Sequence, residues 1–498
     1  MRPLVFDGMA GWLHDGAGDR GVVIAGSHGF EDLCSRKFLT LLARRLSANR
    51  LPVLQFDYPG CGDSLGDHTD PDRVEAWTAG IDKAVDRVKA ETGVTEVVLL
   101  GFRMGALLAM PVAVRRDDII ELVLLAPAPS GKTFVREQVG LSRMVDAALP
   151  PPPSTEPFDG LQAAGFRMSR ATVEDLKSLD PLAAAAASSG LRRALVLTRG
   201  TDPASDPAVA ALRPALASMT AEVFAGYDRL MCDPTAGEIP MAVIERCADW
   251  IGKEAAALHA VVPRGTQWLD GPDFEEEPVV IGSQPEICGV LCRPRGTAVP
   301  RHVFVFLNAG GVPHVGWARG TVEEARALAA QGVASLRIDL PGLGQSEAPE
   351  KSGTFLYDTD TGIHVSRAID WLAARGFSRF GLAGTCSGAF QSFHAARADG
   401  RVSSVAMVNP LCFAWNASYA LDMSVWQTYE TSKADRGLSK AAAGGEEETG
   451  PGGLASGISW IARRSTRRSL EILKSVLSKL TPESVGGGNR VERWMRQL

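Results

Sequence analysis

Short apolar runs alternate with longer amphipathic stretches along most of this chain. The runs are rich in β-branched and aliphatic residues and end in Gly, Pro or Asp, as in GVVIAGSHG (21–29) and HVFVFLNAGG (302–311). Between them lie stretches with a helical spacing of apolar positions, such as FLTLLARRLSANR (38–50) and EEARALAAQG (323–332). Strands that alternate with helices of this length are typical of βαβ units, in which helices cover both faces of a parallel sheet. The pattern predicts an α/β fold of three layers.

The whole pattern occurs twice along the chain, at a nearly constant offset in residue number. Asp57 and Asp339 are separated by almost the same length of chain as Arg103 and Cys386. Matched landmarks at one offset are typical of an internal duplication, so the sequence predicts two tandem α/β domains at 1–256 and 257–435. The matching segments are PVLQFDYPGCGDS (52–64) with VASLRIDLPGLGQS (333–346), EVVLLGFRMGALLA (96–109) with FGLAGTCSGAF (380–390), and IELVLLAPAPS (120–130) with VSSVAMVNPLC (402–412).

Two tight turns of the form G-x-x-x-G occupy matching places in the two halves. GFRMG (101–105) has Arg103 at its centre, and GTCSG (384–388) has Cys386. Such a turn between a strand and a helix can hold a nucleophile above the sheet. A guanidinium stays protonated and cannot attack a carbonyl, whereas a thiol at a helix N-terminus ionises more readily. Cys386 is therefore the predicted nucleophile, and simple packing of a small residue in a tight turn is the alternative.

These motifs resemble those of the α/β-hydrolase superfamily. More narrowly, they resemble the serine-aminopeptidase-like (S33-like) hydrolases found with bacterial exopolysaccharide and exosortase-type clusters. The resemblance rests on HGFED (28–32) and DYPGCGDS (57–64) in the first half, and on NAGGVPHVGWARG (308–320), DLPGLGQS (339–346) and GTCSGA (384–389) in the second. It implies mostly parallel, doubly wound sheets with helical cap insertions, the first cap at about 131–190. It also implies an oxyanion hole of backbone N–H groups, for which the second half offers Ala309, Gly310, Gly311 and Ser387.

The resemblance further implies a catalytic acid after the seventh strand and a histidine after the eighth. In the first half, Asp202 or Asp206 lies at the position of the acid, but AEVFAGYDRLMCDPTAGEIP (221–240) contains no histidine. With arginine at the elbow as well, the first half is predicted to be non-catalytic. Arg103 then either binds an anion in the cleft where an active hydrolase would have its catalytic site, or pairs with Asp202 or Asp206.

The base that would serve Cys386 is harder to assign. By the same offset, the second half ends before its last strand and helix, so we expect it to be C-terminally incomplete. His314 follows the NAGGVP loop and is the predicted catalytic partner of Cys386, while His364 and His394 lie on predicted helices and are interpreted as structural. Asp57 and Asp339 lie in the matching DxPGxG turns and are predicted to brace them.

Composition and charge narrow the range of partners. The 498 residues are 45% hydrophobic and 22% charged with a net charge of −6, which gives no indication of nucleic acid binding. The N-terminus has no signal-peptide pattern and no stretch is apolar enough to span a membrane, which predicts a cytoplasmic protein. The eight cysteines are scattered and show no zinc-ligand spacing, so reduced thiols and no metal or other cofactor are expected.

The pattern changes after residue 435. Residues 436–457 include GGEEETGPGG and are predicted to form a flexible, acidic, Gly-rich linker. Residues 458–498 begin with the basic amphipathic stretch ISWIARRSTRRSLEILKSVLSKL. Such a tail suits an anionic membrane surface, a protein partner or a homodimer contact, and folding back onto the second domain is the alternative.

Two functions of different classes follow from these features. The first is an acyl hydrolase or acyltransferase that uses Cys386 on an ester or thioester, supplied as a small molecule or on an acyl carrier. The second is a catalytically inactive double pseudo-hydrolase that acts as a scaffold or ligand-binding protein in polysaccharide or lipid assembly. The arginine elbow and the missing histidine of the first half favour the second function.

Overall fold

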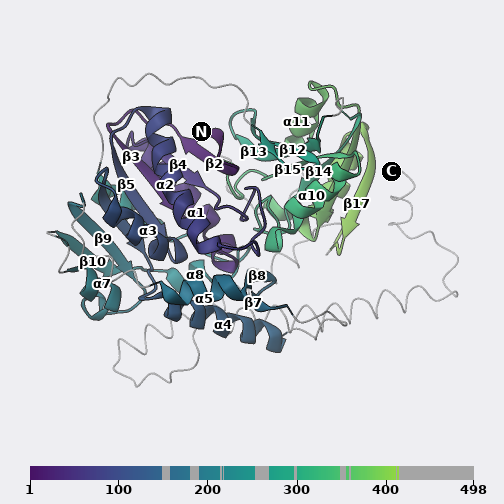
Figure 1. Ribbon diagram of the computed structural model, residues 1–498. Coiled ribbons are helices and arrows are strands. Elements are labelled where there is room, and N and C mark those ends of the chain that lie inside the picture. The colour runs from purple at the N-terminus through teal and green to yellow at the C-terminus, as the bar shows by residue number, and fades with distance from the viewer. Residues whose placement is uncertain are drawn as a thin grey trace, which may run out of the picture.

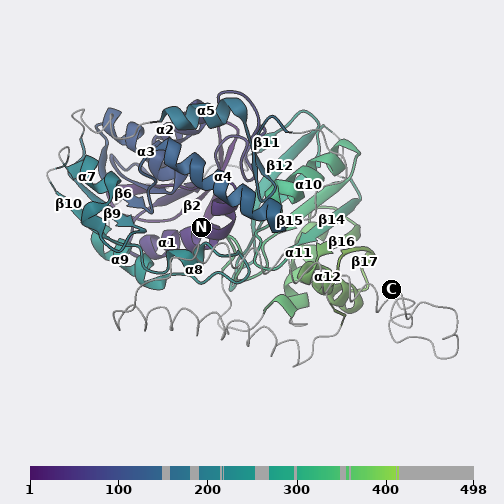
Figure 2. The same cartoon turned by 90° about the horizontal axis from the view of Figure 1, so that it is seen from below.

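The computed structural model contains two α/β bodies that lie side by side (Figure 1). Each is built around one sheet with helices packed against it (Figure 2), so the three-layer α/β fold predicted from the sequence is confirmed. The structure describes residues 1–148, 158–179, 190–213, 216, 218–252, 268–296, 300–347, 355–357, 361–410 and 412–413.

The first sheet has eight strands in the order β1-β2-β4-β3-β5-β6-β9-β10. The pairs β1–β2 and β2–β4 are antiparallel, and all other neighbours are parallel. The strands span Arg2–Phe6 (β1), Met9–His14 (β2), Arg20–Ala25 (β3), Val53–Phe56 (β4), Glu96–Phe102 (β5), Ile119–Leu125 (β6), Arg193–Thr198 (β9) and Met219–Val223 (β10).

Helices cover both faces of the first sheet. One apolar cluster includes Trp77 of α2 and Leu107 of α3, and the other includes Phe38 of α1 and Ile244 of α9. Because both faces are buried, the central strand β5 is apolar nearly throughout instead of alternating. The covering helices span Phe30–Ala48 (α1), Arg73–Thr92 (α2), Met104–Arg115 (α3) and Met241–Ile251 (α9).

A group of smaller elements lies between β6 and β9, over the stretch predicted as a cap. In Figure 1 these elements gather at the lower side of the first body. They are α4 (Gly131–Ala148), the antiparallel pair β7 (Gly160–Ala163) and β8 (Phe166–Ser169), and α5 (Arg170–Ser178). The remaining elements of the first half are η1 (Pro203–Ser205), α7 (Pro207–Leu212) and α8 (Tyr227–Leu230).

The second sheet repeats the arrangement of the first. Its order is β11-β12-β13-β15-β14-β16-β17, in which β12 to β17 take the places of β1 to β6 with the same parallel and antiparallel pairings. The strands span Leu269–Asp270 (β11), Phe274–Ile281 (β12), Ile287–Pro294 (β13), His302–Leu307 (β14), Ala334–Ile338 (β15), Arg379–Thr385 (β16) and Val402–Val408 (β17). The helices span Trp317–Arg319 (η3), Gly320–Ala330 (α10), Phe355–Tyr357 (η4), Gly362–Ala373 (α11) and Ser387–Ala398 (α12).

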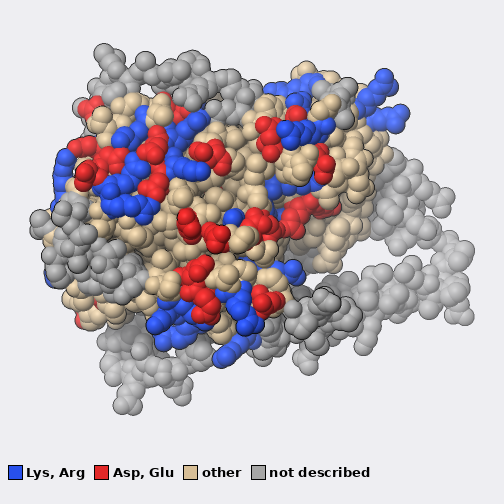
Figure 3. Space-filling view, viewed as in Figure 1, with Lys and Arg blue, Asp and Glu red and all other residues tan. Residues whose placement is uncertain are grey.

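Several predicted features lie outside the described residues. These are the boundary between residues 256 and 257, the linker at 436–457 and the tail at 458–498. Within the described ranges, the second half contains no counterparts of β9 and β10, and no helix is long and apolar enough to cross a membrane. Basic and acidic side chains are interspersed on the face shown in Figure 3.

The two halves pack against each other through contacts that run in both directions. Arg44 of α1 donates a hydrogen bond to the backbone oxygen of Gln345 at 3.0 Å. Arg326 of α10 donates to the backbone oxygen of Asp63 at 2.8 Å. Since Arg326 follows Arg44 at the same distance along the chain as Gln345 follows Asp63, the two hydrogen bonds are equivalent under the internal repeat.

A second pair of contacts follows the same rule. Lys37 donates to the backbone oxygen of Ser346 at 2.9 Å, and Arg319 donates to that of Ser64 at 2.6 Å. Contacts made once in each direction are typical of the two-fold interface of a homodimer. The halves therefore pack like two subunits, although they belong to one chain.

Candidate active site

The turns that follow β5 and β16 have the same backbone conformation. Arg103 has φ 53° and ψ −111°, and Cys386 has φ 55° and ψ −113°. Each residue directly precedes a helix, α3 in the first half and α12 in the second. A positive φ is strained for a residue with a side chain, so both turns keep the sharp geometry of a nucleophile elbow.

The glycine that closes each G-x-x-x-G turn permits this geometry. A Cβ atom on Gly105 would lie less than 3.0 Å from the backbone oxygen of Ala25, and so would one on Gly388 from that of Leu307. Real Cβ atoms essentially never come this close to another atom. The helix can approach the neighbouring strand only because this position carries no side chain.

Arg103 is fully buried and held by carboxylates. Its Nε and Nη2 atoms donate to Oε1 of Glu31 at 3.0 and 2.8 Å, and Nη2 also bonds to Glu137 of α4. Burial disfavours the charge, but Glu31, Tyr227 and Glu137 together raise the pKa of Arg103 above its ordinary range. The first elbow therefore holds a permanent cation that is already paired, and it offers no nucleophile.

The prediction that Arg103 pairs with Asp202 or Asp206 is wrong. Asp202 accepts a hydrogen bond from the N–H of Ala204 at 3.1 Å, and Asp206 accepts one from Ala208 at 2.9 Å. Both carboxylates cap short helices, η1 and α7, as aspartates commonly do.

Cys386 is partly exposed, and its sulfur faces a phenol. The Sγ atom lies 3.6 Å from the hydroxyl of Tyr357 in η4. Burial, and then the neighbouring Cys386, raise the pKa of Tyr357 above its ordinary range. Tyr357 therefore stays protonated near neutral pH and can donate a hydrogen bond to the sulfur.

The loop predicted to form the oxyanion hole lies against this elbow. The N–H of Gly310 donates to the hydroxyl of Ser387 at 2.8 Å, and the N–H of Gly311 donates to the hydroxyl of Thr235 at 3.0 Å. Two of the four predicted oxyanion donors are thus already bonded to side chains. The N–H groups of Ala309 and Ser387 are the remaining candidates to bind a substrate oxygen.

Both ring nitrogens of His314 are bonded to carboxylates and neither to Cys386, so its predicted catalytic role is wrong. Its Nδ1 lies 2.8 Å from Asp339 and its Nε2 lies 2.7 Å from Asp63, with the ring fully buried. Burial alone would lower the pKa of His314, but Asp339 and Asp63 outweigh it and raise the pKa to about 10. Near neutral pH the ring is therefore protonated and bonded at both nitrogens, so it cannot accept a proton from the thiol.

The carboxylates around His314 join the halves. Asp63 of the first half also accepts from Arg337 of the second at 2.9 Å, and Arg337 donates to Glu276 at 2.8 Å. Asp339 accepts from the N–H of Gln345 at 2.9 Å, and Asp57 accepts from that of Asp63 at the same distance. Both Asp57 and Asp339 therefore brace their DxPGxG turns, in the way proposed from the sequence.

The other two candidate histidines also have structural surroundings. Nε2 of His394 lies 3.0 Å from the backbone oxygen of Phe413, and its ring packs 4.3 Å from that of Phe390. His364 is half-buried on α11, where burial lowers its pKa. Within the part of the chain that the structure describes, no histidine or carboxylate hydrogen-bonds to Cys386.

A thiol–imidazole pair that the sequence analysis missed lies in the first half. Sγ of Cys61 is 3.5 Å from Nδ1 of His28, beside a cavity of about 40 Å³. Burial raises the pKa of Cys61 to about 12 and lowers that of His28 to about 3. Both groups are therefore neutral, and the pair is a buried contact without an activated thiolate.

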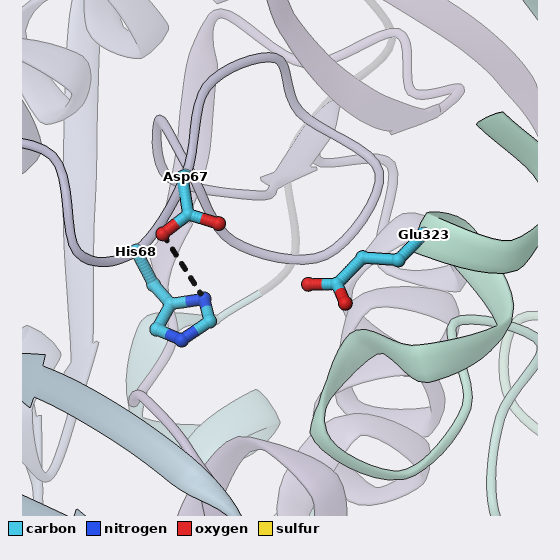
Figure 4. Close-up of side chains that lie close together, drawn as sticks. All are labelled: Asp67, His68 and Glu323. Carbon is cyan, nitrogen blue, oxygen red and sulfur yellow. Dashed lines mark ion pairs between the residues drawn. The ribbon is translucent and has the colours of Figure 1, made fainter. Parts of the chain in front are cut away.

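Asp67, His68 and Glu323 could hold a metal ion where the halves meet (Figure 4). One ligand atom from each lies within 4.8 Å of the others. However, Asp67 already accepts hydrogen bonds from the N–H and the hydroxyl of Thr69, at 2.7 and 2.5 Å. Burial and then the Arg319 guanidinium lower the pKa of His68, despite the nearby Asp67. A cation at this place would compete with the Thr69 donors for Asp67 and be repelled by Arg319, so we do not assign a metal site to this cluster.

The strand orders and the two elbows define the fold of an α/β hydrolase. A family model described as serine aminopeptidase, S33, matches residues 19–154, and no curated protein matches the chain. The family match within the first half, together with the strand orders of the two sheets, confirms the predicted α/β-hydrolase-like fold.

Several solved structures are similar to parts of this chain. Est1E from Butyrivibrio proteoclasticus with bound ferulic acid has 19% identity and a TM-score of 0.37, over 50% of this chain and 98% of that one. A cold-adapted esterase from an Arctic intertidal metagenomic library has 20% identity and a TM-score of 0.24, over 29% of this chain and 65% of that one. An α/β serine hydrolase without lid from Xanthomonas campestris has 20% identity and a TM-score of 0.23, over 26% of this chain and 62% of that one.

Proposed function

We propose that the second half is a thiol-dependent acyl-transfer site, with Cys386 as nucleophile, and that the first half is non-catalytic. The observation that carries this proposal is the strained elbow conformation of Cys386 at the N-terminus of α12, with the Tyr357 hydroxyl at its sulfur. Strain of this kind persists where the surrounding structure enforces it, and it gathers at functional sites.

Two features of the site suit a sulfur nucleophile. The backbone N–H groups and the dipole at the start of α12 attract negative charge at Cys386. The protonated hydroxyl of Tyr357 can donate to the sulfur, and a hydrogen bond to an ionised acceptor is stronger than one to a neutral acceptor. A partly exposed sulfur so placed can reach the carbonyl carbon of a substrate.

The lack of a histidine beside Cys386 within the described residues limits the substrate class that suits the site. In acyl transfer from an oxygen ester, a positioned acid normally protonates the leaving alkoxide. A leaving thiolate needs no such help, because thiols ionise with a pKa of about 8.5. Since no histidine contacts Cys386 within the described residues, we propose a thioester as the substrate, supplied by a small molecule or an acyl carrier.

The reaction balances with the groups at hand. The thiol of Cys386 releases its proton to solvent, its sulfur bonds to the acyl carbon, and the oxyanion accepts hydrogen bonds from the N–H groups of Ala309 and Ser387. The carbon–sulfur bond to the leaving thiolate then breaks, and that thiolate takes a proton from solvent. The oxygen of water, or of an acceptor hydroxyl, then bonds to the acyl carbon as the carbon–sulfur bond to Cys386 breaks. The proton of the attacking group restores the thiol, and the acid or the transferred ester is released.

The test is to trap the acyl-enzyme. The full chain is mixed with an acetyl or octanoyl thioester of N-acetylcysteamine and quenched in acid, and peptide mapping locates the acyl group. We expect acylation at Cys386 that persists in Cys412→Ala and disappears in Cys386→Ala. Absence of acylation in a chain with intact circular dichroism would contradict the proposal.

That outcome would favour the second candidate function, a double pseudo-hydrolase. The observation in its favour is that His314, the histidine nearest to the oxyanion loop in sequence, is fully bonded to Asp63 and Asp339. In that case both clefts would bind ligands without chemistry, in a scaffold for polysaccharide or lipid assembly. The tail at 458–498 would then be the segment proposed to contact a membrane surface, a protein partner or a second copy.

A further inference from the structure

A loop of the first half reaches the oxyanion loop of the second half. This loop follows α8 and includes Asp233, Pro234 and Thr235. It lies within the stretch where the hydrolase resemblance implies a catalytic histidine. Instead of a histidine, it presents the hydroxyl of Thr235, which accepts the N–H of Gly311 at 3.0 Å.

The two loops are in close contact. A Cβ atom on Gly310 would lie less than 3.0 Å from Oγ1 of Thr235, and so would one on Gly311 from the backbone oxygen of Pro234. Side chains at these two positions would therefore collide with the loop of the first half. Because both positions are glycine, the loop of the first half can pack directly against the backbone of the second half.

Thr235 is itself held in place. One carboxylate oxygen of Asp233 accepts the N–H groups of Thr235 and Ala236, at 2.7 and 3.1 Å. The N–H of Gly237 closes the turn onto the backbone oxygen of Asp233 at 2.7 Å. Such a turn fixes the backbone before any ligand arrives, so the acceptor for Gly311 is pre-positioned.

On its other side, the oxyanion loop contacts the elbow. The N–H of Gly310 donates to the hydroxyl of Ser387 at 2.8 Å, and Ser387 directly follows Cys386. The contacts therefore run without a break from Asp233 through Thr235, Gly311 and Gly310 to the residue beside the nucleophile.

We propose that Thr235 is a positioning residue of the thiol site, through which the non-catalytic first half controls acylation in the second. This inference rests on the proposed function of Cys386. Glycine has the widest backbone freedom of any residue, so a loop with two adjacent glycines needs an external contact to hold one orientation. Thr235 supplies that contact and keeps the N–H of Ala309 directed at the developing oxyanion, where the orientation of a donor decides its effect.

The experiment compares three variants with the wild-type chain. Thr235→Val keeps the branched shape and removes the acceptor, and Thr235→Ser restores the acceptor. Thr40→Val is the matched control, because Thr40 donates to Gln345 across the same interface at 3.0 Å but does not contact the oxyanion loop. The readouts are kcat and KM with the octanoyl thioester, alkylation of Cys386 by iodoacetamide, and hydrogen exchange at the amides of residues 308–311.

For Thr235→Val we expect kcat to fall about tenfold or more with KM unchanged, as for loss of an oxyanion donor. Alkylation should stay within about twofold of wild type, because substitution at an alkyl carbon forms no oxyanion. Amide exchange at Gly310 and Gly311 should become faster. Thr235→Ser should recover kcat, and Thr40→Val should leave all three readouts unchanged.

If Cys386 of the wild-type chain is acylated, two results would overturn the inference. One is a kcat of Thr235→Val close to that of wild type. The other is an equal fall of kcat in Thr40→Val, which would indicate general loosening of the interface. If the wild-type chain is not acylated, the proposed function fails separately. Hydrogen exchange then decides the positioning role by itself, and equal exchange at both glycines in Thr235→Val and wild type would refute it.

Discussion

Arg103 and Cys386 share one backbone conformation at one point of a repeated fold, but their side chains have opposite surroundings. The guanidinium is sealed between Glu31 and Glu137, whereas the thiol is partly exposed next to Tyr357. Strain at the elbow is thus kept in both halves, while only the second offers a group that can react. At the first elbow, Arg103 forms a buried ion pair with Glu31 and Glu137 instead.

Replacing Arg103 by methionine should destabilise the chain strongly. Arg103→Met leaves the carboxylates of Glu31 and Glu137 without their buried partner, and breaking a buried ion pair typically lowers stability by about 3–5 kcal/mol. Arg199→Met is the control, because Arg199 binds the same Glu137 from a more exposed position, and about 1 kcal/mol or less is expected. Urea unfolding measures both, and equal effects would contradict the assignment of Arg103.

Stability should depend on pH through His314. Its pKa is about 10 in the folded chain against an ordinary value of 6.5, so its contribution is fully present below about pH 6.5 and is lost as pH rises toward 10. The charged groups that face it are Asp63 and Asp339, with Arg337 bonded to Asp63. Unfolding by urea at pH 6, 8 and 10 should show a decline that His314→Gln removes. An identical decline in the variant would assign it to other groups.

The two equivalent arginines of the interface should contribute unequally. Arg44 donates to the backbone oxygen of Gln345, whereas Arg326 also bonds to the buried carboxylate of Glu276, at 2.6 Å from Nη2. We expect about 1 kcal/mol of destabilisation for Arg44→Ala and about 2–3 kcal/mol for Arg326→Ala, because charged hydrogen bonds contribute more. Urea unfolding of both variants tests this, and a larger effect at Arg44 would be the contrary result.

Removing the hydroxyl of Tyr357 should slow the reaction of Cys386 near neutral pH. Tyr357→Phe deletes the donor 3.6 Å from the sulfur, and loss of a weak hydrogen bond to the attacking sulfur should lower the alkylation rate about three- to tenfold. Iodoacetamide labelling followed by peptide mapping gives both rates. Equal rates across the whole pH range would exclude a role for the phenol.

The sequence predicted the parts of the fold that depend on local pattern. Apolar runs ending in Gly, Pro or Asp marked the strands, and the constant offset that relates Arg103 to Cys386 marked the second copy. The residues of each elbow belong to one strand, one turn and one helix that follow one another along the chain, so the elbow motif is continuous in the sequence. Placement of both turns therefore needed no knowledge of how the halves pack.

The hydrogen-bond and ion-pair partners of the site residues could not be predicted from local sequence pattern. His314 follows a loop at the carboxyl edge of its own sheet, but its second carboxylate, Asp63, lies far away along the chain in the other half. Glu137 reaches Arg103 from the cap. The sequence did contain one indication of the contact between Asp63 and His314. The two matching turns differ at one polar position, which is Asp63 in the first half and Gln345 in the second. The extra carboxylate of Asp63 needs a cationic partner when it is buried, and His314 and Arg337 of the second half provide it across the interface.

The matched contacts of Arg44 and Arg326 have a consequence for how such a protein can change. In a homodimer encoded by one gene, every substitution appears in both subunits at once, so losing a nucleophile removes two active centres together. Once both copies share a polypeptide, each position is inherited separately from its counterpart. Fusion of this kind frees one copy to change independently of the other, and the different side chains of Arg103 and Cys386 at one matched position are an outcome that this freedom permits.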